Sequence, residues 1–91
     1  MSANQVHVYY SGMVQGVGFR YQVRNIAAGF PVLGLVRNLA DGRVELIAEA
    51  DKQTLVDFLA NIDAALGQYI RDKQISWDKA GNDFNDFEIT F

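Results

Sequence analysis

Apolar and more polar residues alternate at the start of the chain, and the pattern becomes helical after a glycine-rich segment. Val6, Val8 and Tyr10 occupy every second position, which predicts a strand over residues 6–11. From position 19 the apolar residues recur after four, seven, eight and eleven positions, as on one face of a helix. The chain therefore opens with a strand, a glycine-rich connection and a helix that begins near residue 19. Gly29 is suited to cap the C-terminal end of this helix, and Pro31 prevents it from continuing.

The next segment has the pattern of two strands joined by a tight turn. Residues 32–38 are apolar and partly β-branched, and the pair 41–42 is Asp-Gly, a dipeptide that favours hairpin turns. Residues 43–50 then place apolar side chains mostly on one face and charged ones on the other. We expect Glu45 and Glu49 to lie on a face that contacts water.

The second half predicts one helix and two further strands. Asp51 is suited to cap the N-terminus of a helix, and the apolar stripe of that helix runs over residues 55–66. Ile75 and Trp77 indicate a strand, and alternation over residues 87–91 indicates a last one. The predicted order is β-α-β-β-α-β-β.

This order predicts one α+β domain over residues 1–91, a ferredoxin-like sandwich. Two helices cover one face of a four- to five-stranded, mostly antiparallel sheet. The first two strands should be parallel, because they flank a helix. With the third strand between them, their carboxyl ends should share one sheet edge, about 10 Å apart.

Composition excludes several classes of protein. The 91 residues include no cysteine and one histidine, so disulfides, thiolate metal sites and a cysteine nucleophile are excluded. We expect no metal and no cofactor. The apolar runs are shorter than the roughly 20 residues that span a bilayer, and the N-terminus is polar. We therefore expect a cytoplasmic monomer without a membrane partner.

The net charge of −3 conceals an asymmetry between the two halves. Residues 1–45 hold four arginines and two acidic residues, whereas residues 46–91 hold four basic and nine acidic residues. The first half therefore favours an anionic ligand. The acidic total disfavours nucleic acid as a partner, because its binding needs a broad basic face.

The connection from Gly12 to Arg20 is the best candidate for an anion site. Three glycines allow backbone N–H groups to turn inward beside a helix N-terminus, which attracts anions. Arg20 falls in the first helical turn, where the helix dipole disfavours a cation, so a bound anion would explain its presence. The spacing differs from both common nucleotide-binding loops. An ordinary glycine-rich turn explains the loop equally well.

Asn38 ends the second predicted strand, at the sheet edge that the glycine-rich connection shares. Its amide offers an acceptor and two donors, so it could hold and orient a water molecule. Arg37 could add a positive field there. Taken alone, Asn38 is better explained as the start of the hairpin turn, a common position for asparagine.

The two segments together carry a resemblance to a known family. Residues 12–20, GMVQGVGFR, resemble the acylphosphatase motif G-x-V-Q-G-V-x-F-R at every specified position. The stretch from Gly34 to Asn38, with Gly42-x-Val44, resembles the second motif of that family. The likeness covers essentially the whole chain. Leu35 and Ala50 depart from the residues usual in the family.

The resemblance implies hydrolysis of small-molecule acyl phosphates without a metal or a covalent intermediate. It implies that Arg20 and the loop amides bind the phosphoryl group and that Asn38 orients the attacking water. The implied loop residues are Met13, Val14, Gln15, Gly16, Val17, Gly18 and Phe19. The alternatives are a noncatalytic ferredoxin-like module that binds an anion or RNA, and part of a larger carbamoyl-transfer enzyme. The lack of a cysteine-rich extension argues against the last.

The remaining polar and aromatic residues have simpler explanations. His7 is expected on the helix-free face of the sheet and outside the catalytic site. The acidic cluster of Asp83, Asp86 and Glu88 is expected to be a solvated turn and strand face. Trp77 and the C-terminal phenylalanines are expected to pack in the core or at a strand edge.

Overall fold

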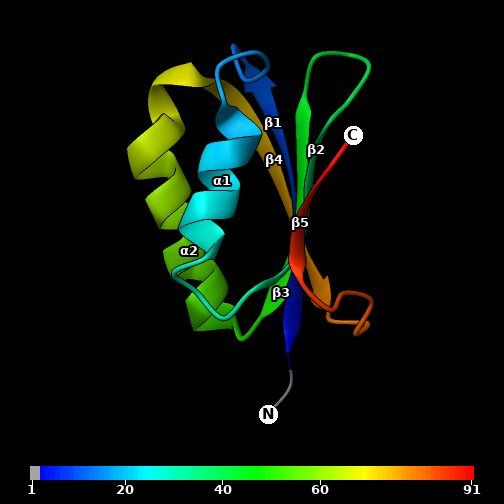
Figure 1. Ribbon diagram of the computed structural model, residues 1–91. Coiled ribbons are helices and arrows are strands. Elements are labelled where there is room, and N and C mark those ends of the chain that lie inside the picture. The colour runs from blue at the N-terminus through cyan, green and yellow to red at the C-terminus, as the bar shows by residue number, and fades with distance from the viewer. Residues whose placement is uncertain (1–2) are drawn as a thin grey trace.

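The computed structural model describes residues 3–91 and has two helices on one face of a five-stranded sheet (Figure 1). The predicted order of elements is confirmed, and their bounds are β1 (Asn4–Gly12), α1 (Phe19–Ala27), β2 (Leu33–Asn38), β3 (Val44–Ala50), α2 (Lys52–Leu66), the 3-10 turn η1 (Gly67–Tyr69), β4 (Ile70–Lys79) and β5 (Phe87–Thr90). The expected ferredoxin-like arrangement of layers is therefore confirmed.

The strands are ordered β4-β1-β3-β2-β5 across the sheet. β3 pairs antiparallel with both β1 and β2, so β1 and β2 run parallel with β3 between them. β5 pairs parallel with β2, which makes the sheet mixed but mostly antiparallel. As predicted, the carboxyl ends of β1 and β2 share one edge of the sheet. The loop before α1 and the β2–β3 hairpin meet at this edge (Figure 1).

Alternate side chains of the inner strands pack under the two helices. Val6, Val8 and Tyr10 of β1 are fully or almost fully buried. The helices bury the faces that the sequence pattern predicts, including Val23 of α1 and Phe58 of α2. Full burial of one such side chain contributes roughly 1.5–3 kcal/mol, so this layer supplies most of the apolar stabilisation.

The ends of the elements follow local chemistry. Asp51 caps α2, because its Oδ1 accepts a hydrogen bond from the Thr54 backbone N–H at 2.8 Å. The first helix ends at Ala27, just before Gly29, where the sequence predicts its C-terminal cap, and Phe30 packs against Phe58 at 5.8 Å between ring centroids. β4 is longer than the pattern around Ile75 indicated, because it pairs with β1 along its whole length.

The helix-free face of the sheet differs from the expected solvated face. The residues Glu45 and Glu49 are only 4% and 5% exposed. The Glu45 carboxylate accepts hydrogen bonds from His7 Nε2 at 2.6 Å and Arg37 Nε at 2.5 Å. Gln5 Nε2 donates to Glu49 at 2.9 Å. The prediction of wet carboxylates was wrong, because flanking strands supply polar side chains that cover them.

His7 lies on this helix-free face, as expected, and its ring joins the Glu45 network. Burial raises the pKa of Glu45, but hydrogen bonds from Arg37 and His7 outweigh it and hold the pKa below its usual value. Within residues 3–91, no helix is long and apolar enough to span a membrane.

Candidate functional site

The loop between β1 and α1 makes one wall of the candidate site. Gly16 and Gly18 have positive φ angles of 80° and 76°, a region that side chains with a Cβ rarely adopt. Gly18 is the N-cap of α1, so the chain turns sharply there and the first helical N–H groups face the loop. The glycines thus have a conformational role whether or not an anion binds.

Three residues of the loop fix it to the rest of the fold. The Gln15 amide nitrogen donates to the backbone oxygens of Leu39 at 2.8 Å and Arg43 at 2.9 Å. These two bonds tie the loop to the β2–β3 hairpin. Val14 is fully buried and Val17 packs against the core, so the loop is held from both sides. The hairpin, and with it Asn38, is thereby set at a defined distance from the loop.

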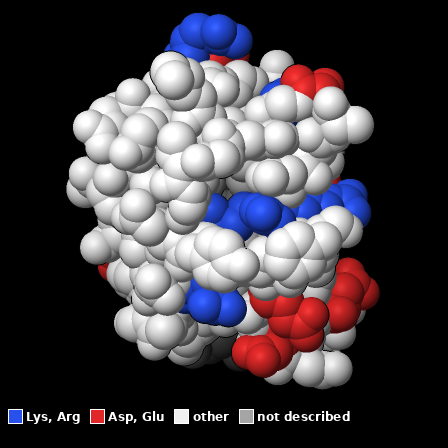
Figure 2. Space-filling view, turned by 45° about the horizontal axis from the view of Figure 1, so that its top comes forward, with Lys and Arg blue, Asp and Glu red and all other residues white. Residues whose placement is uncertain are grey.

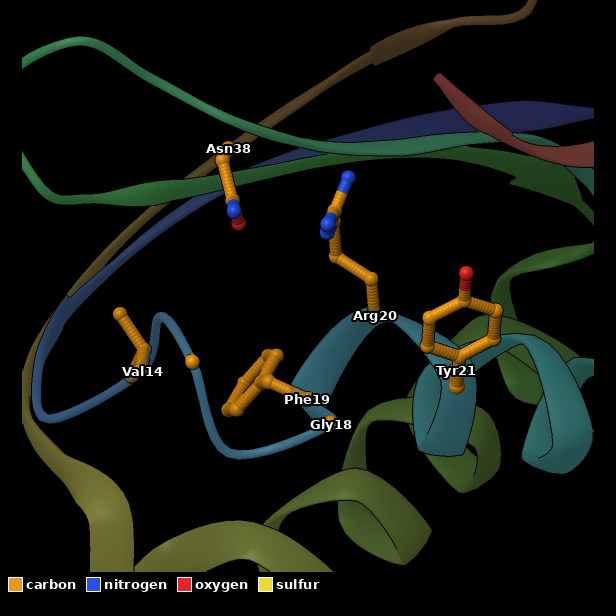
Figure 3. A pocket seen from close by; sticks show the side chains of 7 residues that line it. Val14, Gly18, Phe19, Arg20, Tyr21 and Asn38 are labelled. Carbon is orange, nitrogen blue, oxygen red and sulfur yellow. The ribbon is translucent and has the colours of Figure 1, made fainter. Parts of the chain in front are cut away.

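Arg20 extends from the first turn of α1 towards the sheet. Its Nη1 donates to the backbone oxygen of Thr90 at 3.3 Å, and its Cζ lies 4.8 Å from the centroid of the Phe91 ring. These contacts orient the guanidinium group. Figure 3 shows that this group and the Asn38 amide point into the same space above the loop. The planar guanidinium can donate two parallel hydrogen bonds to phosphate or carboxylate.

Asn38 is the last residue of β2 and faces the loop. Its Oδ1 is buried and has no hydrogen-bond partner among residues 3–91. Buried polar atoms are usually hydrogen-bonded, so an unpaired acceptor at a cavity wall marks a place where a ligand or water could bind. The simpler explanation, that Asn38 only starts the hairpin, does not account for this oxygen.

These groups enclose a cavity of about 270 Å³. Its lining consists of Val14, Gly16, Gly18, Phe19, Arg20, Tyr21 and Asn38. Six of these residues were predicted from the sequence. The other predicted residues do not line it: Met13 is 76% exposed, Gln15 bonds to the hairpin, and Val17 packs against the core.

Tyr21 is the one lining residue that sequence reasoning missed. It is 49% exposed and stands beside Arg20 (Figure 3). A large aromatic residue off the apolar stripe of a helix, directly after Arg20, was the available indication. Arg37, which was expected to strengthen the positive field near Asn38, instead pairs with Glu45 on the other face of the sheet.

The charge around the cavity favours an anion. Figure 2 shows basic side chains at the centre of the face that carries the hollow, with acidic side chains grouped below them. Within residues 3–91, no group of three His, Asp or Glu side chains could hold a metal ion. The groups at hand are a guanidinium, a helix N-terminus with its loop, and an amide, which together can bind a tetrahedral anion and one water.

Known proteins are similar to this chain in both sequence and fold. An acylphosphatase from Treponema denticola is 57% identical over 54 residues, which are 59% of this chain and 57% of that protein. The matched segment is thus less than two thirds of that relative's length. One from Leuconostoc mesenteroides is 38% identical over 90 residues, 98% of each chain. The crystal structure of acylphosphatase from Bacillus subtilis superposes with a TM-score of 0.88 at 30% identity, covering 97% of this chain and 99% of that one.

The family model described as Acylphosphatase matches residues 6–89. That range includes the whole glycine-rich loop, Arg20, Asn38, three complete strands and most of β1 and β5. The agreement of the family model, of a nearly full-length relative and of the superposed crystal structure shows that this chain belongs to the acylphosphatase family.

Proposed function

We propose that the protein hydrolyses acyl phosphates to a carboxylate and inorganic phosphate, and that residues 1–91 do so as one domain. The observation that supports this most is that Arg20 and Asn38 point into one cavity above the glycine-rich loop (Figure 3). Family membership supports the substrate class. We further propose that the protein works as a cytoplasmic monomer.

The phosphoryl group would sit between the loop and Arg20. Backbone N–H groups of the loop from Val14 to Phe19 would contact its oxygens, although the side chains of Val14 and Val17 serve mainly to anchor the loop. The Met13 N–H instead donates to the backbone oxygen of Tyr69 at 2.9 Å. The guanidinium would balance charge on the equatorial oxygens as the P–O bond to the acyl group lengthens. Stabilisation by one such preorganised group is worth roughly a hundredfold to a thousandfold in rate.

Asn38 would hold the attacking water through its buried Oδ1, which has no partner among the residues that the structure describes. The water oxygen attacks phosphorus, the bond from phosphorus to the acyl oxygen breaks, and the carboxylate leaves with the electron pair. The water proton passes to a phosphate oxygen. A carboxylate is a good leaving group, so this reaction needs positioning and charge stabilisation more than a strong general acid.

The direct test is hydrolysis of benzoyl phosphate in the presence of EDTA. We expect turnover, with kcat reduced on the order of a hundredfold or more in Arg20→Ala and Asn38→Ala. Arg20→Lys should also be poor, because an ammonium group lacks the bidentate geometry. Arg71→Ala removes an exposed arginine of β4 whose side chain does not line the cavity, and it serves as the matched control.

Isotope labelling tests the assigned bond cleavage. In water enriched in oxygen-18, attack at phosphorus puts the label in inorganic phosphate, whereas attack at the carbonyl puts it in the carboxylate. Binding of phosphate without turnover of any acyl phosphate would instead favour a noncatalytic anion-binding module. A single species of about 10.2 kDa in sedimentation equilibrium would support the monomer.

A further inference from the structure

A second cavity of about 530 Å³ lies next to the first, and Tyr21 lines both. Its walls come from α1 and from the C-terminal part of the chain, including Phe87, Ile89 and Phe91. Arg20 lies at the junction, because it lines the first cavity and stacks on Phe91, which lines the second. A ligand bound to Arg20 could therefore extend past Tyr21 into the second cavity.

We propose that this second cavity binds the acyl group of the substrate and favours uncharged aromatic acyl groups. The proposal rests on the proposed function, because it places the phosphoryl end of the same substrate on Arg20. It assigns Tyr21 and Phe91 as specificity-determining residues.

The apolar surface of the cavity suits an aromatic ring. Tyr21 and Phe91 are 49% and 91% exposed, so both offer ring surface that a ligand can cover. Phe87 is partly buried, and its ring meets Phe58 of the core edge-on at 5.9 Å between centroids. Ile89 also packs against the core. The cavity thus combines a floor fixed by core packing with aromatic walls that water now contacts.

The charges around the cavity select against an anionic acyl group. Asp86 and Glu88 line it together with a single cation, Arg24. The Arg24 guanidinium lies 5.3 Å from the centroid of the Tyr21 ring, which holds the cation against one wall. With Arg20 paired to the phosphoryl group, two carboxylates against one guanidinium leave a net negative lining that repels a second negative charge on the acyl group. An uncharged ring avoids this repulsion and gains contact with the aromatic walls.

The first test compares kcat/KM for benzoyl phosphate and acetyl phosphate. Covering about 60 Å² of additional apolar surface corresponds to roughly tenfold in affinity, so we expect at least that preference for benzoyl phosphate. Tyr21→Ala and Phe91→Ala should each lower the benzoyl-to-acetyl ratio severalfold. Trp77→Ala removes an exposed aromatic residue from β4, at the opposite edge of the sheet, and should leave the ratio unchanged.

The second test addresses charge. Benzoyl phosphate with a para carboxylate should have a lower kcat/KM than benzoyl phosphate itself. Glu88→Gln should reduce the ratio of these two kcat/KM values by about threefold, because it removes one of two repelling charges. Equal ratios in wild type and Tyr21→Ala, or no discrimination against the carboxylate, would overturn the proposal while leaving hydrolysis itself intact.

Binding measurements can test the acyl-binding cavity even if the protein proves not to hydrolyse acyl phosphates. If no acyl phosphate is hydrolysed, the nonhydrolysable benzoylphosphonate and acetylphosphonate still report on the cavity. We expect tighter binding of the benzoyl compound by calorimetry, and NMR shift changes at Tyr21, Phe87 and Ile89 that acetylphosphonate does not cause. Shift changes confined to the glycine-rich loop with both compounds would contradict an acyl-binding cavity.

Discussion

Asn38 has a buried oxygen at the wall of a cavity with no hydrogen-bond partner in the described part of the chain, so its replacement should separate stability from activity. Asn38→Ala removes a half-buried side chain at a cavity wall, and its Oδ1 accepts no hydrogen bond from residues 3–91 that the variant would break. We expect the free energy of unfolding to change by no more than about 1 kcal/mol, which is about 4–8 °C in Tm for a domain of this size.

The effect of Asn38→Ala on catalysis should be much larger. Loss of the group that orients the attacking water should lower kcat at least a hundredfold, equivalent to about 2.7 kcal/mol of transition-state stabilisation. Urea denaturation gives the stability, and the initial rate of benzoyl phosphate hydrolysis gives the activity. Inorganic phosphate should inhibit the variant almost as well as wild type, because Arg20 and the loop are unchanged.

Val36→Ala is the matched control in the same strand. Val36 is fully buried, two residues before Asn38, and its side chain faces the core. We expect it to lose about 2 kcal/mol of stability while the folded fraction keeps its activity. If Asn38→Ala instead lost stability like Val36→Ala and kept kcat within threefold, Asn38 would be a structural residue and the assignment of the water would be wrong.

Three further outcomes follow from other contacts. The pKa of Glu45 is lower in the folded state than in the unfolded state. The ionised carboxylate therefore stabilises the fold fully above the unfolded pKa of about 4.3, and this stabilisation is lost as pH falls through the folded pKa. Glu45→Gln should therefore cost about 2 kcal/mol at pH 7 and flatten the loss of stability in acid, as urea titrations between pH 7 and pH 3 would reveal. A Cβ on Gly34 would lie 1.9 Å from the backbone oxygen of Ile47, so Gly34→Ala should unfold the protein by circular dichroism, whereas Gly67→Ala, with open space around it, should be neutral. Gln15→Ala removes both bonds to the hairpin and should weaken competitive inhibition by phosphate about tenfold with little change in Tm; equal inhibition would show that the loop holds its shape without them.

Local chemistry made some features predictable from the sequence alone. The period of the apolar residues gave the order of strands and helices, because one face of each element must be buried. Asp51 was predictable as a cap, since its side chain bonds to a backbone N–H only three residues away. The parallel relation of β1 and β2 followed from the helix between them, because a helical crossover returns the chain to the same end of the sheet. Arg20 and Asn38 were found through two motifs, each a short stretch of residues close together in sequence.

Features that depend on residues distant in sequence were not predictable in this way. Glu45 occupies a position in the alternating strand pattern that predicts exposure to solvent. In the fold, His7 and Arg37 reach it from the strands on either side and bury it. The length of β4 depends on its pairing with β1 and hardly on its own pattern. In both cases the deciding contacts are set by the order of strands in the sheet.

By itself, the sequence determined the elements of this protein, the glycine-rich loop and the two polar residues, Arg20 and Asn38, that lie in the motifs resembling those of the family. The tertiary structure decided what those residues face. It brought the Arg20 guanidinium and the Asn38 amide to one cavity, and it brought β5 and Phe91 beside Tyr21 to form the second. The physical reason is that periodicity and turn chemistry act over a few residues, whereas a cavity is enclosed by surfaces that come together only when the sheet and helices pack.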